Sequence, residues 1–341
     1  MRLSVLDLVP VRTDQTTADA LAATVRLAQT ADRLGFTRYW VAEHHNMPGI
    51  ASSSPAVLIG HIADVTSTIR VGSGGVMLPN HAPLAVAEQF GMLEAFHPGR
   101  IDLGIGRAPG TDGVTAAALR GTRSVSADDF PSELGQLLAF FDGEFPAEHP
   151  FGRITAVPAR GNVPAFWLLG SSNYSAQVAA YLGLPFAFAH HFSPDNTLPA
   201  LATYRSLFRP SDTLATPYAL VAVAVVCAES NERAAWLALP GALSFLRLRS
   251  GQPGLLPTPE EAAGYPYTSV EQAFIQQRQA HQVIGDPTAV THGLAALLQQ
   301  TAADELMLMT VVHDHADRVR SYELVASETI PRLQPNWSAS T

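Results

Sequence analysis

The chain has 341 residues, of which 47% are hydrophobic and 15% charged, and its net charge at pH 7 is −9. This composition supports a large buried core, excludes a disordered chain and lacks the basic excess that nucleic-acid binding requires. All 21 basic residues are arginines, which excludes Schiff-base, pyridoxal-phosphate and P-loop chemistry because each of these needs a lysine amine.

The N-terminal third alternates short apolar runs with longer stretches of helical period. Apolar side chains recur at helical spacing from Leu21 to Leu34 and stop at Gly35. Pro55 and Pro83 fit the first turn of a helix. We therefore expect strands over 2–9, 39–42, 70–76 and 100–106, and helices over 16–35, 55–66 and 83–96.

The rest of the chain first loses this pattern and then resumes it. Residues 107–164 contain a glycine-rich loop, one helix over about 128–141 and a proline-rich stretch. After them we expect strands over 165–169, 186–189, 217–227 and 305–312, and helices over 174–182, 198–207, 270–283, 288–301 and 315–333, with a further helix beginning at 231. The proline- and glycine-rich residues 250–268 form an insertion in the pattern.

These apolar runs predict an α/β fold, a closed (β/α)₈ TIM barrel. Strands without polar alternation are buried on both faces, as in parallel sheets. Strand–helix units in a chain of this length fit one barrel domain over residues 1–341, with insertions after strands four and seven. An open doubly wound sheet is the alternative, but the segment after the first strand, VPVRTDQTT, has no glycine for a dinucleotide-binding turn.

Cysteine content and hydropathy predict the compartment. Cys227 is the one cysteine, so an intrachain disulfide is excluded and a reducing compartment, the cytoplasm, is expected. The longest apolar run, residues 218–228, is shorter than the ~20 residues of a membrane helix. The N-terminal segment is typical of a strand rather than a signal peptide, and we expect no membrane association.

Polar and small residues follow the expected strands at the ends where barrel enzymes bind ligands. Ser171, Ser172 and Ser175 lie where the fifth strand ends and a helix begins, so their hydroxyls and the free N–H groups there can bind an anion. Arg107, after the fourth strand, can add a planar guanidinium group whose N–H donors fit a phosphate. Serines that only cap the helix are the alternative. Without a Walker motif, the combination favours a mononucleotide or another phosphorylated ligand.

A run of small residues, Gly72-Ser73-Gly74-Gly75, lies inside the third expected strand. Glycine weakens strands and often marks a place where a ligand approaches the backbone. The run therefore indicates a place where a flat ring lies against the chain. A packing contact with a bulky neighbour is the alternative.

Histidines follow several strands, but a catalytic metal is not expected. His44 and His45 are adjacent on a strand and point to opposite faces. His313 and His315 can share an ion, but the first expected strand lacks the histidines of a metal-dependent hydrolase barrel. His44 is the candidate general acid–base or hydrogen-bond donor. Glu43 and His45 are expected to pair within the protein or at a subunit interface.

Three segments resemble the bacterial luciferase-like flavin monooxygenases. They are AEHHN at 42–46, VGSGGVMLPNHAPLAVAEQFGMLEAFHPGRIDLGIGR at 71–107 and GSSNYSAQVAAYLGLP at 170–185. The resemblance covers nearly the whole chain and implies a barrel that binds FMN, usually as a homodimer. It places a non-prolyl cis peptide under the flavin ring at Gly74–Gly75, the phosphate site on Arg107, Ser171, Ser172 and Ser175, and the catalytic histidine on His44. His190 stands where luciferase has a tryptophan beside the flavin, and we expect it to contact the cofactor.

The resemblance also implies a reaction. A separate flavin reductase would supply reduced FMN, and O2 would oxygenate a small organic substrate, with His44 as the proton donor and residues 250–268 as the lid. Gly106 replaces the reactive cysteine of luciferase and His190 its tryptophan, which argues against an aldehyde substrate and light emission. The loops consist mainly of proline, glycine, alanine and leucine, a composition that favours an apolar, uncharged substrate. F420-dependent hydride transfer and a catalytically silent flavin-binding protein stay open as alternatives.

Overall fold

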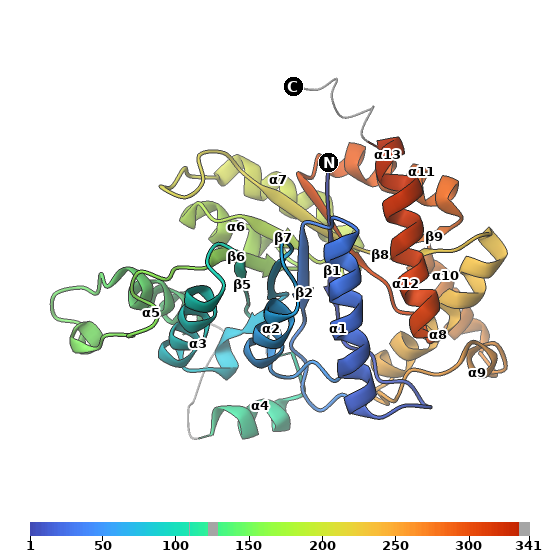
Figure 1. Cartoon of the computed structure of the whole chain (residues 1–341), viewed down its shortest axis with the longest axis horizontal. Coiled ribbons are helices and arrows are strands. Elements are labelled where there is room, and N and C mark those ends of the chain that lie inside the picture. The colour runs from blue at the N-terminus through green and yellow to red at the C-terminus, as the bar shows by residue number, and fades with distance from the viewer. Residues whose placement is uncertain (109, 122–128, 334–341) are drawn as a thin grey trace.

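The computed structural model describes residues 1–108, 110–121 and 129–333 and confirms the predicted barrel (Figure 1). Within this described part, eight parallel strands close on themselves because the last strand pairs with both the first and the seventh. The barrel strands are β1 (Arg2–Asp7), β2 (Arg38–Val41), β3 (Arg70–Ser73), β5 (Ile101–Gly106), β6 (Ala165–Gly170), β7 (Phe186–Phe188), β8 (Ala219–Cys227) and β10 (Glu305–Met309). Two short strands are added, β4 (Val76–Met77) beside β5 and β9 (Val283–Gly285) beside β8.

Helices surround the barrel, and α1, α2 and α12 lie on the side that faces the viewer in Figure 1. The helices that lie between barrel strands or follow the last one are α1 (Thr17–Arg33), α2 (Pro55–Asp64), α3 (Pro83–Phe96), α6 (Asn173–Leu182), α7 (Thr197–Leu207), α11 (Pro287–Thr301) and α12 (His315–Leu324). The insertion after the fourth barrel strand contains α4 (Gly113–Arg120) and α5 (Phe130–Asp142). The region after the seventh contains α8 (Asn231–Arg249), α9 (Pro259–Ala263) and α10 (Ser269–Gln279), and α13 (Ile330–Leu333) follows α12.

Three of the boundaries that differ from the sequence prediction lie in the two insertions. Helix α4 begins in the expected glycine-rich loop because the Asp112 side chain accepts hydrogen bonds from two N–H groups of its first turn. Helix α8 continues to Arg249 with Pro240 inside it. The helix expected over 270–283 ends at Gln279, and the apolar Val283–Gly285 pairs with the end of β8 instead.

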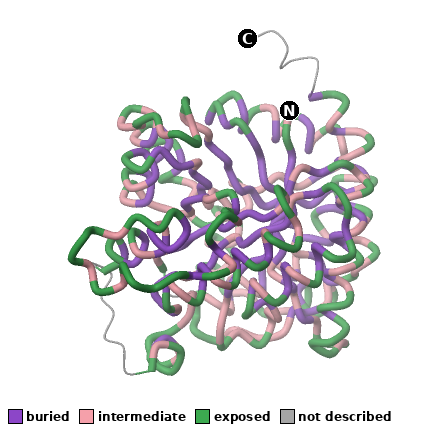
Figure 2. The backbone as a smooth tube through the Cα atoms, turned by 60° about the vertical axis from the view of Figure 1, so that its left-hand side comes forward, coloured by how far each residue is buried: buried purple, intermediate pink, exposed green. Residues whose placement is uncertain are grey.

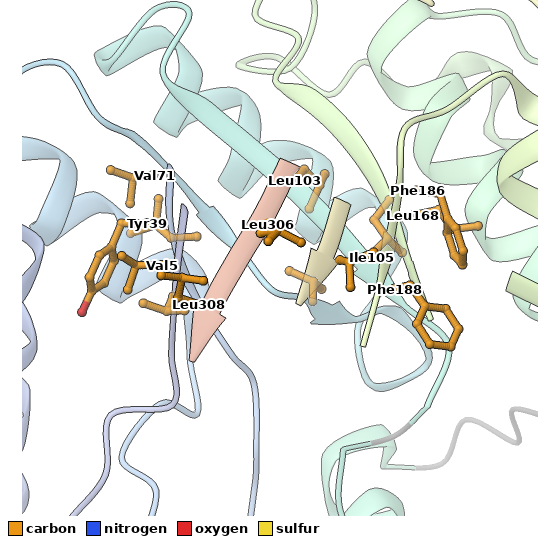
Figure 3. Close-up of a cluster of buried hydrophobic side chains, with 14 of the residues drawn as sticks. Val5, Tyr39, Val71, Leu103, Ile105, Leu168, Phe186, Phe188, Leu306 and Leu308 are labelled. Carbon is orange, nitrogen blue, oxygen red and sulfur yellow. The ribbon is translucent and has the colours of Figure 1, made fainter. Parts of the chain in front are cut away.

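Strand alternation divides the buried side chains into two layers. One layer faces the helices, and Figure 3 labels Val5, Tyr39, Val71, Leu103, Ile105, Leu168, Phe186, Phe188, Leu306 and Leu308 from it. The other fills the barrel and contains Leu6, Trp40, Trp167, Ala187, Leu220, Ala222, Ala224, Met307 and Met309. Figure 2 shows buried backbone in the interior and mostly exposed or intermediate backbone around it. Both faces of the strands are therefore buried, as the apolar runs predict.

The N-terminal end of the barrel is closed by buried charges that neutralise one another. Arg38 Nη1 lies 2.8 Å from Asp102 Oδ2, and Arg38 Nε lies 3.1 Å from Glu305 Oε1. Arg70 Nη2 is 2.7 Å from the other oxygen of Asp102. Trp40 donates to Asp102 over 2.9 Å. Two arginines and two carboxylates thus pair where four strands begin, as burial of charge requires.

No helix among the described residues has the length and apolar character needed to span a membrane.

Candidate active site

The opposite end of the barrel contains a cavity of about 700 Å³. Its walls come from the segments that follow the strands, from α8 and α10, and from Pro253, Gly254 and Leu256 of the insertion. Its floor is the upper layer of the barrel interior, with Leu6, Ala222, Met307 and Met309 among the lining residues. The cavity is thus where parallel-barrel topology places a ligand.

The cavity brings together most of the residues predicted from the sequence. The lining includes His44 after β2, Gly74 and Gly75 after β3, Arg107 after β5, and Ser171, Ser172 and Ser175 at the β6–α6 junction. Segments far apart in the chain therefore meet in one space, because each follows a strand of the same closed sheet.

His190 is not part of this group. Strand β7 ends at Phe188, and the His190 Nδ1 lies 2.8 Å from Thr197 Oγ1 at the start of α7. His191 lines the cavity instead, and its Nδ1 donates to the Ala222 carbonyl over 3.2 Å. Burial lowers the pKa of His191 to about 4, so this ring is neutral at pH 7. The family resemblance predicts cofactor contact for His190, but in the structure the adjacent His191 is the one that lines the cavity.

The peptide bond between Gly74 and Gly75 is cis. A Cβ at Gly75 would lie 2.7 Å from the Gly104 carbonyl oxygen, and a Cβ at Gly74 would lie 2.8 Å from Leu6 Cδ1. Packing against the barrel therefore requires glycine at 75, as the packing alternative proposes. The same two residues also line the cavity, so the backbone itself is the surface that a ligand would meet.

The junction between β6 and α6 has the properties of an anion site. Ser172 occupies the N-cap position of α6, but its side chain makes no capping hydrogen bond. The Arg107 guanidinium carbon lies 4.3 Å from the Tyr174 ring centroid, and no carboxylate in the described ranges forms an ion pair with it. A cation, serine hydroxyls and the positive end of a helix thus line one cavity, and no acidic side chain of the described residues pairs with the cation.

Glu43 joins the segment after β2 to the segment after β3. Its buried carboxylate accepts a hydrogen bond from the Met77 N–H over 3.0 Å and lies 2.9 Å from His45 Nε2 and 2.8 Å from His81 Nε2. Burial alone would raise the pKa of Glu43, but hydrogen bonds from His81, His45 and Met77 outweigh it and hold the pKa below its usual value. The expected pairing of Glu43 and His45 within the protein is confirmed.

His44 is half-buried on the cavity wall. Its backbone N–H donates to the Ser52 carbonyl over 2.9 Å, which fixes the segment. Its buried Nδ1 has no hydrogen-bond partner among the residues that the structure describes. Burial lowers the pKa of His44 more strongly than the nearby Glu43 raises it, so the imidazole is neutral at pH 7 with one donor and one acceptor nitrogen.

The insertion after the seventh barrel strand covers the cavity. Pro253, Gly254 and Leu256 line it. Leu256 donates its N–H to the Val11 carbonyl over 2.8 Å and accepts from the Thr13 N–H over 3.1 Å. The expected lid is therefore connected by backbone hydrogen bonds to the loop after β1.

Several cavity residues were not singled out from the sequence. Ser244 and Phe245 reach the cavity from α8, and Arg278 reaches it from α10. None of them follows a barrel strand. Periodicity places these residues on helices but does not say which helices extend over the top of a barrel.

Comparison with known proteins gives one consistent family. Residues 1–305 match the family model described as luciferase-like monooxygenase. A luciferase-like monooxygenase of Escherichia coli (strain K12) is 46% identical over 321 residues, 94% of this chain and 95% of the relative. N-acetyl-S-alkylcysteine monooxygenase of Bacillus subtilis (strain 168) is 33% identical over 333 residues, 97% and 98% of the two chains. The crystal structure of apo-MsnO8 matches with a TM-score of 0.87 and 40% identity over 96% of this chain and 98% of that one.

Proposed function

The chain belongs to the luciferase-like monooxygenase family, and we propose on that basis that it is an FMN-dependent monooxygenase that uses O2 to oxygenate a small organic substrate. One observation supports this most: a single cavity is lined by the start of α6, which lacks a side-chain cap, by an arginine that pairs with no described carboxylate, by the glycine backbone of Gly74–Gly75 and by a half-buried histidine. A ligand with a flat ring and an anionic tail fits this cavity, because its ring can lie against the glycine backbone and its tail can reach Arg107 and the start of α6.

The residues present fit FMN at both ends. Arg107, with the hydroxyls of Ser171, Ser172 and Ser175, would hold the phosphate, because Ser172 makes no cap hydrogen bond and Arg107 has no described carboxylate to compete. The backbone at Gly74–Gly75 would lie against the ring. His190, turned toward Thr197, would support the wall from behind rather than contact the ring, and His191 would take its place.

The chain's own residues would serve the reaction in three ways. When bound in its reduced form, FMN supplies the electrons that activate O2. Leu6, Met307 and Met309 make the cavity floor apolar, which excludes water from the reacting atoms. His44 is neutral because its pKa is lowered by burial, so it can donate a proton from one ring nitrogen and recover it at the other.

We propose a single catalytic domain over residues 1–341 that forms a homodimer and receives reduced FMN from a separate flavin reductase, as the family resemblance implies. The single cysteine supports a cytoplasmic location. The segment 250–268 would act as the lid, since Leu256 is positioned over the cavity by hydrogen bonds to Val11 and Thr13.

Two linked measurements test the proposed function. Titration of the purified protein with FMN, followed by quenching of flavin fluorescence, should show binding, and F420 should not bind with comparable affinity. With NADH and a flavin reductase present, a thioether probe such as methyl octyl sulfide should gain oxygen from isotopically labelled O2. Binding of F420 in preference to FMN would support hydride transfer instead. Binding of FMN with no oxygen transfer to any of a panel of small probes would support the silent flavin-binding protein.

A further inference from the structure

A second half-buried arginine that pairs with no carboxylate of the described chain lines the cavity, and it comes from α10 rather than from the segment after β5. Arg278, near the end of α10, lines the cavity together with Phe245 of α8. Its guanidinium carbon lies 3.3 Å from the centroid of the Phe245 ring. Phe245 in turn stacks on Phe274, with ring centroids 6.0 Å apart and planes 5° from parallel. Arg278 is therefore held in place by a stack of planar groups.

The charge of Arg278 is not neutralised by the described protein. Its Nη1 donates to the His191 carbonyl over 3.3 Å. Its Nε is buried without a partner, and no acidic side chain of the described ranges pairs with it. Burial lowers its pKa to about 10, which leaves the group charged at pH 7. A half-buried charge that pairs with no counter-ion of the described chain is costly, so this position favours an anion supplied by a ligand.

Ser244 adds a second free hydrogen-bonding group to the same wall. It precedes Phe245 on α8, lines the cavity, and has a buried Oγ without a partner among the described residues. Cavity-lining residues with such an orphaned polar atom are His44, Ser244 and Arg278. His44 belongs to the catalytic group proposed above. Ser244 and Arg278 have no function in holding FMN as proposed, since its phosphate falls at the β6–α6 junction.

We propose that Arg278 and Ser244 form a carboxylate-binding subsite for the substrate. The inference rests on the proposed function, because it assumes that the flavin phosphate occupies the Arg107 site. It narrows the substrate class to molecules with an apolar body, suited to the leucine and methionine wall, and one acidic group. This differs from the uncharged substrate that the loop composition favours. The planar guanidinium fork sets the direction in which the apolar body enters the cavity.

A matched pair of probes tests the subsite on the protein with FMN bound. Octanoate and octan-1-ol have the same chain length and differ in charge, and their binding is followed by the change in the visible spectrum of the bound flavin. Wild-type protein should bind octanoate about tenfold or more tightly than octan-1-ol. Equal affinities for the two probes would overturn the proposal without any variant being made.

Substitutions locate the effect. Arg278→Met should remove most of the preference for octanoate while leaving the affinities for FMN and octan-1-ol within about twofold, and Ser244→Ala should reduce the preference by a few-fold. Arg249→Met is the matched control, because Arg249 also lines the cavity but is exposed. An equal loss in Arg249→Met would show a general effect of positive charge and contradict a built subsite.

The FMN affinities of wild type and of Arg278→Met distinguish a failure of the carboxylate subsite from a failure of the proposed function. If wild-type protein fails to bind FMN, the proposed function fails. If it binds FMN but Arg278→Met lowers the FMN affinity tenfold or more, Arg278 belongs to the cofactor site and the carboxylate subsite is wrong. If Arg278→Met does not fold, the preference for octanoate over octan-1-ol is measured in Arg278→Gln instead, where it should also fall, and the wild-type preference still tests the proposal.

Discussion

The two ends of the barrel treat charge in opposite ways. At the end where the strands begin, Arg38 and Arg70 are paired with Asp102 and Glu305 within 2.7–3.1 Å. At the end where the strands finish, Arg107 and Arg278 line a cavity, and neither is paired with a carboxylate of the described chain. The first end is neutral and needs nothing from outside. The second carries uncompensated positive charge, which is the property of a surface built for an anionic ligand.

The two ends differ in how their arginines are paired because one end contributes to the stability of the fold and the other, as proposed, binds a ligand. A buried cation that loses its counter-ion destabilises the fold, so complete pairing serves stability. A cation with no protein counter-ion retains its electrostatic energy for a ligand, at a cost in stability that the ligand offsets when it binds. Substitutions at the first end should therefore act on folding, and substitutions at the second on binding and turnover.

The largest effect is expected at the paired end. Asp102→Ala leaves Arg38 and Arg70 without one of their partners and removes the acceptor of Trp40. We expect a loss of about 3–5 kcal/mol in the free energy of unfolding, measured by urea denaturation. The control is Asp317→Ala, which removes an exposed ion pair with Arg233 and should cost about 1 kcal/mol or less. Similar losses in the two variants would mean that the buried cluster contributes no more than a surface pair.

The next effect concerns catalysis at the open end. His44→Ala removes the neutral imidazole on the cavity wall and should lower turnover about 10²-fold or more, with FMN affinity changed only a few-fold. Steady-state turnover and flavin titration of the same preparation measure both quantities. His190→Ala is the neighbouring control, because His190 is hydrogen-bonded to Thr197 outside the cavity lining. Full activity in His44→Ala would remove His44 from the mechanism.

Cofactor affinity should respond to Arg107. Under the proposed function, Arg107→Ala would remove a charge-assisted contact with the phosphate worth about 1.5–3 kcal/mol, and we therefore expect FMN binding to weaken more than tenfold. The urea midpoint should change little, since the guanidinium contacts the Tyr174 ring and no described carboxylate. An FMN affinity equal to that of wild type would assign Arg107 a structural role only. It would also contradict the view that unpaired arginines at the open end bind ligands.

The smallest effect is a dependence of stability on pH. The pKa of Glu43 is held below its usual value by hydrogen bonds from His81, His45 and Met77. The unfolded chain therefore binds a proton at higher pH than the folded chain does. The stabilisation is present above the unfolded pKa near 4.5 and is lost as pH falls through the lower folded value. Urea midpoints measured from pH 6 to pH 3 should decline less steeply for Glu43→Gln than for wild type, and parallel curves would contradict this.

The sequence predicts the barrel and many of the residues at its open end, but it does not predict the buried ion pairs at the other end. The barrel follows from apolar runs that are buried on both faces, and the site residues that directly follow strands, such as His44 and Arg107, are collected by closure of the sheet. The choice between His190 and His191 depends on the local turn after β7, which alternation does not determine once the strand ends at Phe188. Arg278 and Ser244 lie on helices of an insertion whose path over the cavity is set by tertiary contacts, including the hydrogen bonds of Leu256 with the loop after β1.

The most direct test of the central claim compares FMN with riboflavin, which has the same ring and lacks the phosphate. The account predicts that wild-type protein binds FMN more than tenfold more tightly than riboflavin in calorimetric titrations at fixed salt, and that Arg107→Ala abolishes this difference while retaining riboflavin binding. Equal affinities for the two flavins in wild-type protein would contradict the claim that the unpaired charge at the open end of the barrel exists to bind the cofactor phosphate.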